Sequence, residues 1–340
     1  MQCAALCANV IDRHLMDFSV VVAAREDDRP PLEVLDIAAV ADRLGYRELW
    51  IGEGPTWDAF ALATAIGRSI GQAALTAGPI AASVRDPAMI ARGAGDVELL
   101  TGRVTGVALG TSSVRVVEGI HGRSRARAAT VLAESATALR PIFGKDASTP
   151  RPDDPPVHGF RRRLSPATGL LTIAAFGDRA IAIAAEHADR MVLDLVSPDQ
   201  VRMLRAKLDA AADRIGRPAP RLAAWLPTAV DPDERSYTQL LGSIAGYLSV
   251  RGYREMFEVA GFGAAVELAA GGADRERLVA ELPREAAAIV GVVGDAAAVR
   301  ARLDDYAAAG LDELVIHPAT AGDPAGEHTL TALAEFATVG

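Results

Sequence analysis

The chain has 340 residues, of which 50% are hydrophobic, 23% charged and 5% aromatic. This composition excludes intrinsic disorder and collagen, and a chain of this length can bury a large core. The net charge of −9 argues against a partner with exposed phosphates, such as a nucleic acid or an anionic membrane. The two cysteines, Cys3 and Cys7, exclude a disulfide scaffold and are only a weak signal for a metal site.

Residues 1–16 lack the basic segment and the long apolar run of a signal peptide, and no stretch has 18 uninterrupted apolar residues. We therefore expect a flexible leader over residues 1–16, one domain over residues 17–340, and a cytoplasmic protein.

Eight short apolar runs, most of them followed by a helical pattern, recur along the chain. They are residues 18–23, 49–52, 75–82, 104–109, 170–174, 190–193, 222–226 and 314–316. Runs without polar alternation indicate parallel strands that helices cover on the outside. Eight such strands with crossover helices predict a TIM (β/α)8 barrel, an α/β fold. A doubly wound open sheet is the structural alternative.

Helical patterns are predicted between these strands. They lie near residues 34–44, 58–70, 87–101, 126–143, 178–188, 198–215 and 295–309. Two connections, residues 110–169 and 230–290, are too long for simple loops. Both follow a strand, so we expect them over the C-terminal face of the barrel, as substrate lids.

Side chains at the carboxyl ends of barrel strands carry the chemistry of this fold. Glu53 follows the second strand, Asp194 the sixth and His317 the eighth. Because Glu53 ends a buried strand, it is our candidate for handling a proton or for contacting the ring of a bound cofactor. Its alternative role is a hydrogen bond to the loop backbone. Motifs for a metal hydrolase, an acyl transferase or a P-loop enzyme are absent.

Five segments together resemble the bacterial luciferase-like flavin family. They are residues 45–53 (GYRELWIGE), 57–60 (WDAF), 84–88 (VRDPA), 100–103 (LTGR) and 174–177 (AAFG). Within that family the likeness is greatest to oxidoreductases that use the deazaflavin coenzyme F-420, including methylenetetrahydromethanopterin reductase. The resemblance implies a barrel that binds F-420, or alternatively FMN, across its C-terminal mouth.

Family members often have a cis peptide and a bulge in the third strand that supports the flavin ring. The matching position here is Gly78 and Pro79, where proline makes the cis form less costly. The alternative is a trans kink at a strand edge.

A cofactor phosphate is expected at the start of the helix after the fifth strand, because free N–H groups there attract anions. The candidate residues are Ala175, Phe176, Gly177, Asp178 and Arg179. Asp178 argues against this placement because a carboxylate repels phosphate. Asp178 could instead cap the helix, with Arg179 balancing its charge.

Several further side chains are candidates for contact with the ligand. Thr111, Ser112 and Ser113 could bond the polar edge of the ring, or cap the next segment. His121 is preferred to His317 as a catalytic histidine, since insertion loops reach ligands and Pro318 indicates a turn. Trp57 could line the substrate pocket or belong to the core.

An arginine series, Arg115, Arg123, Arg125 and Arg127, makes the first insertion basic. It could hold the acidic tail of F-420 or be a solvated surface.

The leading functional interpretation is hydride transfer between F-420 and a small organic substrate. An FMNH2-dependent monooxygenase is the alternative, and a barrel that binds ligand without turnover is a third possibility. We expect a homodimer through the helices near residues 31–45 and 58–70, which carry the small residues Ala39, Ala63 and Ala65.

Overall fold

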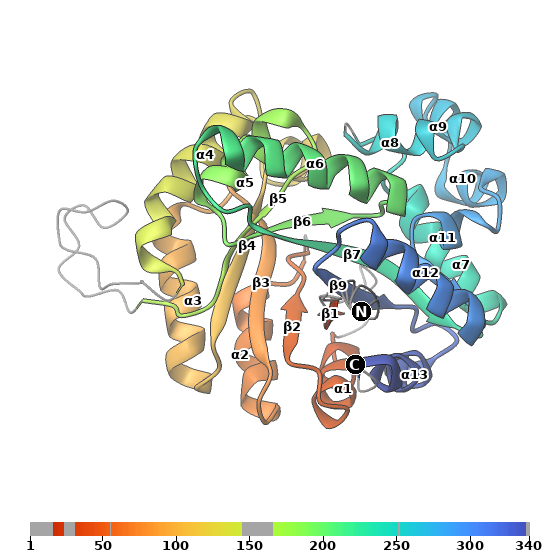
Figure 1. Cartoon of the computed structure of the whole chain (residues 1–340), viewed down its shortest axis with the longest axis horizontal. Helices are drawn as coiled ribbons and strands as arrows, with labels where there is room; N and C mark the ends of the chain where they lie inside the picture. The colour runs from red at the N-terminus through yellow and green to blue at the C-terminus, as the bar shows by residue number, and fades with distance from the viewer. Residues whose placement is uncertain (1–15, 24–30, 55, 145–165, 251, 338–340) are drawn as a thin grey trace, which may run out of the picture.

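The computed structural model describes residues 16–23, 31–54, 56–144, 166–250 and 252–337. In this part of the chain, parallel strands form a closed barrel with helices around it (Figure 1). The barrel strands are β1 (Asp17–Val22), β2 (Glu48–Ile51), β3 (Ala74–Ala81), β4 (Thr105–Gly110), β5 (Leu171–Ala174), β6 (Arg190–Asp194), β7 (Arg221–Val230) and β9 (Glu313–Pro318). Pairing of β6 with β7 closes the ring. The TIM barrel prediction is therefore confirmed, and the open-sheet alternative is wrong.

All but the last of the surrounding helices match the predicted positions within a few residues. They are α1 (Glu33–Arg43), α2 (Ala59–Ser69), α3 (Pro87–Thr101), α4 (Ala128–Leu139), α5 (Asp178–His187), α6 (Pro198–Arg214), α12 (Ala296–Ala308) and α13 (Glu327–Ala337). Local signals explain their ends: Asp58 accepts hydrogen bonds from the first N–H groups of α2, and Gly102 adopts the left-handed conformation that ends α3. Helix α13 was not predicted.

The two insertions contain shorter elements. The first holds the π-helix η1 (Arg115–Ile120), α4 and the 3-10 helix η2 (Arg140–Ile142); the second holds α7 (Glu234–Ala245), α8 (Tyr253–Val259), α9 (Gly263–Ala270), α10 (Arg275–Glu281) and α11 (Ala286–Ile289). A short strand, β8 (Val292–Gly294), pairs with the end of β7, and the 3-10 helix η3 (Pro324–Gly326) precedes α13. Strand β8, which lies directly after the predicted insertion of residues 230–290, was not predicted.

The helices of the second insertion share a hydrophobic cluster that is distinct from the main core. Its fully buried members include Ile244, Leu248, Phe257 and Val290. The main core lies between the barrel strands and their covering helices. We call α7 to α11 the cap, since it lies to one side of the barrel in Figure 1.

A buried charged network occupies the amino-terminal end of the barrel. Arg190 lies 2.7 Å from both Glu313 and Glu48, and its guanidinium stacks on the Trp50 ring at 4.2 Å. Ser19 donates a 2.6 Å hydrogen bond to Glu313. These polar contacts fill the amino-terminal end of the barrel.

The helices predicted to form the dimer contact do not expose all the small residues that were expected at their surface. Ala39 and Ala65 are exposed, but Ala63 is fully buried in the main core. Ala63 therefore does not belong to an outer surface, and homodimerisation stays a prediction. No helix in the described ranges has the length and apolar character needed to cross a membrane.

Candidate functional site in the mouth of the barrel

Small residues lie at several strand ends in the carboxyl-terminal mouth. Ala23, Gly52, Gly110 and Ala174 follow or end strands β1, β2, β4 and β5. A Cβ placed on Gly110 would lie 3.4 Å from the Cβ of Ala174 and 3.8 Å from that of Pro79, so these small residues are close neighbours.

Strand β3 carries a bulge beside these small residues. The peptide between Gly78 and Pro79 is cis, and the pairing with β4 shifts between Ala77 and Ile80. Gly78 has a φ of +122°, a value that residues with a side chain rarely adopt. The cis interpretation of Gly78 and Pro79 is confirmed, and the trans alternative is wrong.

Large and titratable side chains also lie in the mouth, on β6, β7 and β9. Asp194 pairs in register with Trp225, whose indole ring lies 6.4 Å from the ring of His317. Trp225 also makes an edge contact with Trp50, at 5.8 Å. Among the described residues, the buried indole nitrogen of Trp225 has no hydrogen-bond partner.

Burial shifts the pKa of both titratable groups toward their neutral forms. Burial lowers the pKa of His317 to about 4. It raises the pKa of Asp194 to about 7, although hydrogen bonds from Tyr253 and from the N–H of Leu195 act in the opposite direction. Near pH 7, His317 is therefore neutral and Asp194 exchanges its proton readily.

Glu53 lies beside a guanidinium at the ends of β2 and β3. Its Oε1 accepts hydrogen bonds of 2.8 and 2.5 Å from Arg85, and its Oε2 accepts one of 2.8 Å from the N–H of Ala59. Arg85 also bonds Asp58, at 2.7 Å. The predicted backbone hydrogen bond is present, and Glu53 also has an ionic partner that was not predicted. Proton handling by Glu53 stays a prediction.

The loop after β4 is held by a side chain from the same insertion. Arg125 donates to the carbonyl oxygen of Ser112 at 2.8 Å and to the hydroxyl of Thr111 at 3.2 Å. Ser113 accepts a hydrogen bond from the N–H of Val116 in η1, so the capping alternative holds for this residue. Arg125 thus fixes the loop; contact of this loop with a ring stays a prediction.

His121 ends the π-helix and its side chain is exposed. Its catalytic role stays a prediction. Arg127 pairs with Glu134 across an exposed surface, as the solvated alternative for the arginine series expects.

The start of α5 is open, as a phosphate site requires. Gly177 is the exposed N-cap residue, and a Cβ placed there would meet no atom within 4 Å. Asp178 is the first helical residue and pairs with Lys207 at 2.8 Å, while Arg179 bonds Thr130. The capping role suggested for Asp178 is therefore wrong, and Lys207, not Arg179, balances its charge.

Phe176 links this helix start to the cap. Its ring lies 4.7 Å from that of Tyr253 in α8, and the Tyr253 hydroxyl donates a 2.9 Å hydrogen bond to Asp194. Ala175, next to Phe176, is buried in the main core. The cap thus reaches the strand ends at Tyr253.

Trp57 is half-buried and packs against the main core. Its buried indole nitrogen has no partner among the described residues, as for Trp225. Both the core and the pocket interpretations of Trp57 therefore keep support.

Sequence reasoning missed Arg85, Trp225 and Tyr253 as site residues. Arg85 lies within one of the segments that carried the family resemblance, and Trp225 lies inside a predicted strand. Tyr253 gave no signal, since its contact with Asp194 joins residues 59 positions apart in the sequence.

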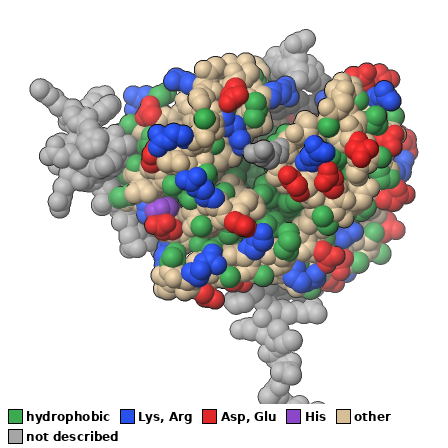
Figure 2. Space-filling view, turned by 90° about the horizontal axis from the view of Figure 1, so that it is seen from above, with side chains coloured by type: hydrophobic (Ala, Val, Ile, Leu, Met, Phe, Trp, Pro, Cys, Tyr) green, Lys and Arg blue, Asp and Glu red, His purple; other side chains and the backbone are tan. Residues whose placement is uncertain are grey.

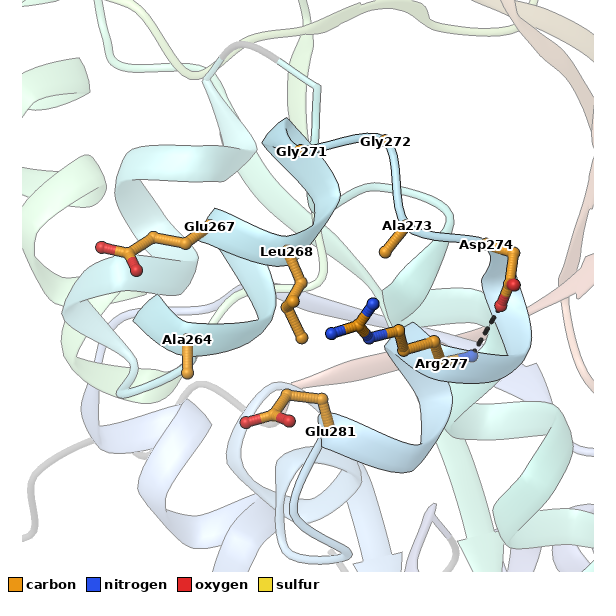
Figure 3. Close-up of a pocket in the computed structure, with 9 residues that line it drawn as sticks. All are labelled: Ala264, Glu267, Leu268, Gly271, Gly272, Ala273, Asp274, Arg277 and Glu281. Atoms are coloured by element: carbon orange, nitrogen blue, oxygen red, sulfur yellow. Dashed lines mark hydrogen bonds between the residues drawn. The ribbon is translucent and has the colours of Figure 1, made fainter.

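Figure 2 shows a hollow with hydrophobic side chains between two parts of the surface, of which the cap side is rich in Asp and Glu. A separate groove of about 740 Å³ lies within the cap, between α9 and α10 (Figure 3). Its charged side chains are Glu267, Asp274, Arg277 and Glu281. This groove is not formed by the ends of the barrel strands, so it is distinct from the mouth.

Comparison with protein-family models matches residues 16–313 to the luciferase-like monooxygenases. The chain belongs to this family. It is therefore an enzyme of the luciferase-like oxidoreductase group, as the resemblance of its five segments implied. Comparison with curated protein sequences gives no significant match.

Solved structures of similar fold include enzymes with two kinds of cofactor. A coenzyme F-420-dependent tetrahydromethanopterin reductase from Methanopyrus kandleri has a TM-score of 0.73 at 14% identity, covering 94% of this chain and 97% of that one. An F-420-dependent secondary alcohol dehydrogenase has a TM-score of 0.70 at 15% identity, with the same coverage.

The FMN-bound oxygenating constituent of 3,6-diketocamphane monooxygenase from Pseudomonas putida has a TM-score of 0.65 at 17% identity, covering 94% of this chain and 97% of that one. At these identities the likenesses show the fold.

The residues of the mouth are compatible with a flavin or a deazaflavin. The bulge at Gly78 and Pro79 lies among small strand-end residues, and the N-terminus of α5, whose first residues are exposed, suits a phosphate.

Proposed function

We propose that this enzyme transfers a hydride between coenzyme F-420 and a small organic substrate. The observation that carries the proposal is a barrel mouth in which small strand-end residues, Ala23, Gly52, Gly110 and Ala174, lie together with Asp194, Trp225 and His317. The small residues suit a planar cofactor, and the titratable side chains suit the reacting part of a substrate. The presence of two F-420 enzymes among the structures of similar fold supports the choice of F-420.

Each part of the bound cofactor has a candidate partner. The bulge at Gly78 and Pro79 and the loop of Thr111, Ser112 and Ser113 would contact the ring. The N–H groups at Gly177 would hold the phosphate. The cofactor supplies the hydride donor or acceptor, and the protein supplies orientation and exclusion of water.

An FMNH2-dependent monooxygenase is the second candidate function. It is favoured by the likeness to the FMN-bound monooxygenase from Pseudomonas putida. Titration of the purified apo-protein with F-420 and with FMN distinguishes the two. Selective binding of F-420 is the expected result, and selective binding of FMN would overturn the F-420 proposal in favour of the monooxygenase.

We expect Gly177→Val to weaken cofactor binding at least about tenfold while the fold is kept, because a bulky side chain keeps the phosphate from the backbone N–H groups. The position is open and its φ of −82° suits any residue, so thermal unfolding should change little. The measurement is the Kd for F-420 and for an analogue without the phosphate. If affinity falls equally for both compounds, the phosphate binds at another site.

We expect Glu53→Gln to lower turnover about tenfold or more while the cofactor Kd changes less than about threefold, because a proton-handling group acts in the transition state. Steady-state kinetics and a binding titration measure the two quantities. Asp58→Asn is the control, since Asp58 pairs with the same Arg85. Equal losses of turnover in both variants would assign the effect to the placement of Arg85.

A further inference from the structure

The structure brings a carboxyl group and a phenol together where the cap meets the barrel mouth. Asp194 is the last residue of β6, and the hydroxyl of Tyr253 in α8 donates a 2.9 Å hydrogen bond to its Oδ2. Trp225 is the in-register neighbour of Asp194 on β7, and among the described residues its buried indole nitrogen has no hydrogen-bond partner. A buried carboxyl group at a strand end of the barrel mouth is a candidate proton donor to an oxygen atom of a ligand.

The walls around this pair are aromatic. The ring of Tyr253 lies 4.7 Å from Phe176, 4.8 Å from Tyr247 and 6.0 Å from Phe257. Within the described ranges, no lysine or arginine contributes to the electrostatic environment of Asp194. A substrate carboxylate or phosphate would have no cation to pair with here, so a neutral molecule with an apolar body fits best.

Resting on the proposed F-420 function, we propose that Asp194 is the catalytic acid for the oxygen of a neutral aldehyde or ketone, with Tyr253 as the residue that positions its carboxyl group. In the reduction, the C=O π bond breaks and its carbon gains a hydride from reduced F-420. The oxygen gains the proton of Asp194, giving an alcohol. F-420 loses two electrons, and Asp194 regains a proton from water. In the reverse direction, the Asp194 carboxylate accepts the proton of the alcohol.

Few other groups influence the pKa of Asp194. Its carboxyl group accepts hydrogen bonds from the Tyr253 hydroxyl and from the N–H of Leu195. Tyr247 influences the pKa of Tyr253, and His317 lies on the far side of Trp225. His317 has a pKa of about 4 and stays neutral while Asp194 titrates near pH 7. The Tyr253 hydrogen bond lowers the pKa of Asp194, so its removal should raise the pH at which Asp194 loses its proton.

The first experiment uses the apo-protein and needs no substrate. Tryptophan fluorescence is followed against pH, with Trp225 beside Asp194 as the reporter. We expect a transition near pH 7 in the parent, its loss in Asp194→Asn, and a shift to higher pH in Tyr253→Phe. Asp199→Asn and Tyr237→Phe, which alter a neighbouring exposed carboxylate and a tyrosine of α7, are controls and should titrate like the parent. A transition that persists in Asp194→Asn would overturn the assignment.

The second experiment follows oxidation of reduced F-420 with a panel of neutral aldehydes and ketones and a panel of 2-oxo acids. We expect turnover with neutral members, with kcat/KM that falls as pH rises through about 7. Asp194→Asn should lower kcat about a hundredfold or more and should abolish the fall of kcat/KM near pH 7. Tyr253→Phe should shift that fall to higher pH. An unchanged profile in Asp194→Asn, or turnover confined to the 2-oxo acids, would overturn the proposal.

The outcomes for the two proposals are separable. If F-420 does not bind, the proposed function fails and this inference fails with it. If F-420 binds with normal affinity but no neutral carbonyl compound is reduced, only the inference about Asp194 fails.

Discussion

Replacement of Arg190 by methionine is expected to lower the free energy of unfolding by about 3 to 5 kcal/mol, because it leaves buried carboxylates without their cation. Arg190 is fully buried and lies 2.7 Å from both Glu48 and Glu313. Methionine keeps most of the side-chain volume, so the loss reports the charge. Urea unfolding at constant protein concentration measures the effect.

The pH dependence of this loss follows from the carboxyl groups. Burial by itself would raise the pKa of Glu48, but the charge and hydrogen bonds of Arg190 outweigh burial and lower it. Without Arg190, burial dominates and the folded-state pKa exceeds the unfolded-state value. The free energy of unfolding of the variant then declines as pH rises through the folded-state pKa. The difference in stability between the parent and Arg190→Met should therefore be larger at pH 8 than at pH 5.

Arg202→Met is the matched control for Arg190→Met. Arg202 pairs with the exposed Asp199 on α6, and its removal should cost less than about 0.5 kcal/mol. Equal costs for the two arginines, or a deficit at Arg190 that shrinks as pH rises, would refute the account of the network.

Gly78→Ala is expected to destabilise the protein by about 3 kcal/mol or more, because both its backbone conformation and its surroundings exclude a side chain. Its φ is +122°, and an added Cβ would contact the carbonyl oxygen of Ala108 and lie 2.6 Å from the N–H nitrogen of Ile80. Both contacts are with backbone atoms of paired strands, which cannot move aside easily. Thermal and urea unfolding measure the loss.

Gly177→Ala is the control for Gly78→Ala, since nothing lies within 4 Å of its Cβ position. We expect it to change stability by less than about 0.5 kcal/mol. If Gly78→Ala is as stable as this control, the bulge in β3 tolerates a side chain, and its close backbone contact with β4 is not required for folding.

The sequence contained the information for the barrel in local patterns. Each barrel strand is a short apolar run, such as Val20, Val21 and Val22, whose residues are all buried. Capping residues such as Asp58 and a stop residue such as Gly45, with a φ of +84°, mark the adjacent helices. These signals depend on neighbours within a few positions, so one sequence is sufficient to interpret them.

The contacts that define the site depend on residues distant in the chain. Glu53 could be selected as a strand-end carboxylate, but its partner Arg85 lies 32 positions later. Asp194 could be placed at a strand end, whereas the approach of Tyr253 depends on how the cap packs. The buried position of Ala63 likewise follows from tertiary packing and not from its helical spacing. Periodicity gives no information about such pairings.

The cap also has a consequence for how mutations in different parts of the chain combine. Most of its fully buried residues, among them Ile244, Phe257 and Val290, pack in a cluster separate from the main core. Tyr253 packs against both clusters, so it links the cap to the barrel. Substitutions deep in the cap should therefore add their energies to those in the barrel, whereas substitutions around Tyr253 should couple to both, because residues that share partners are not additive.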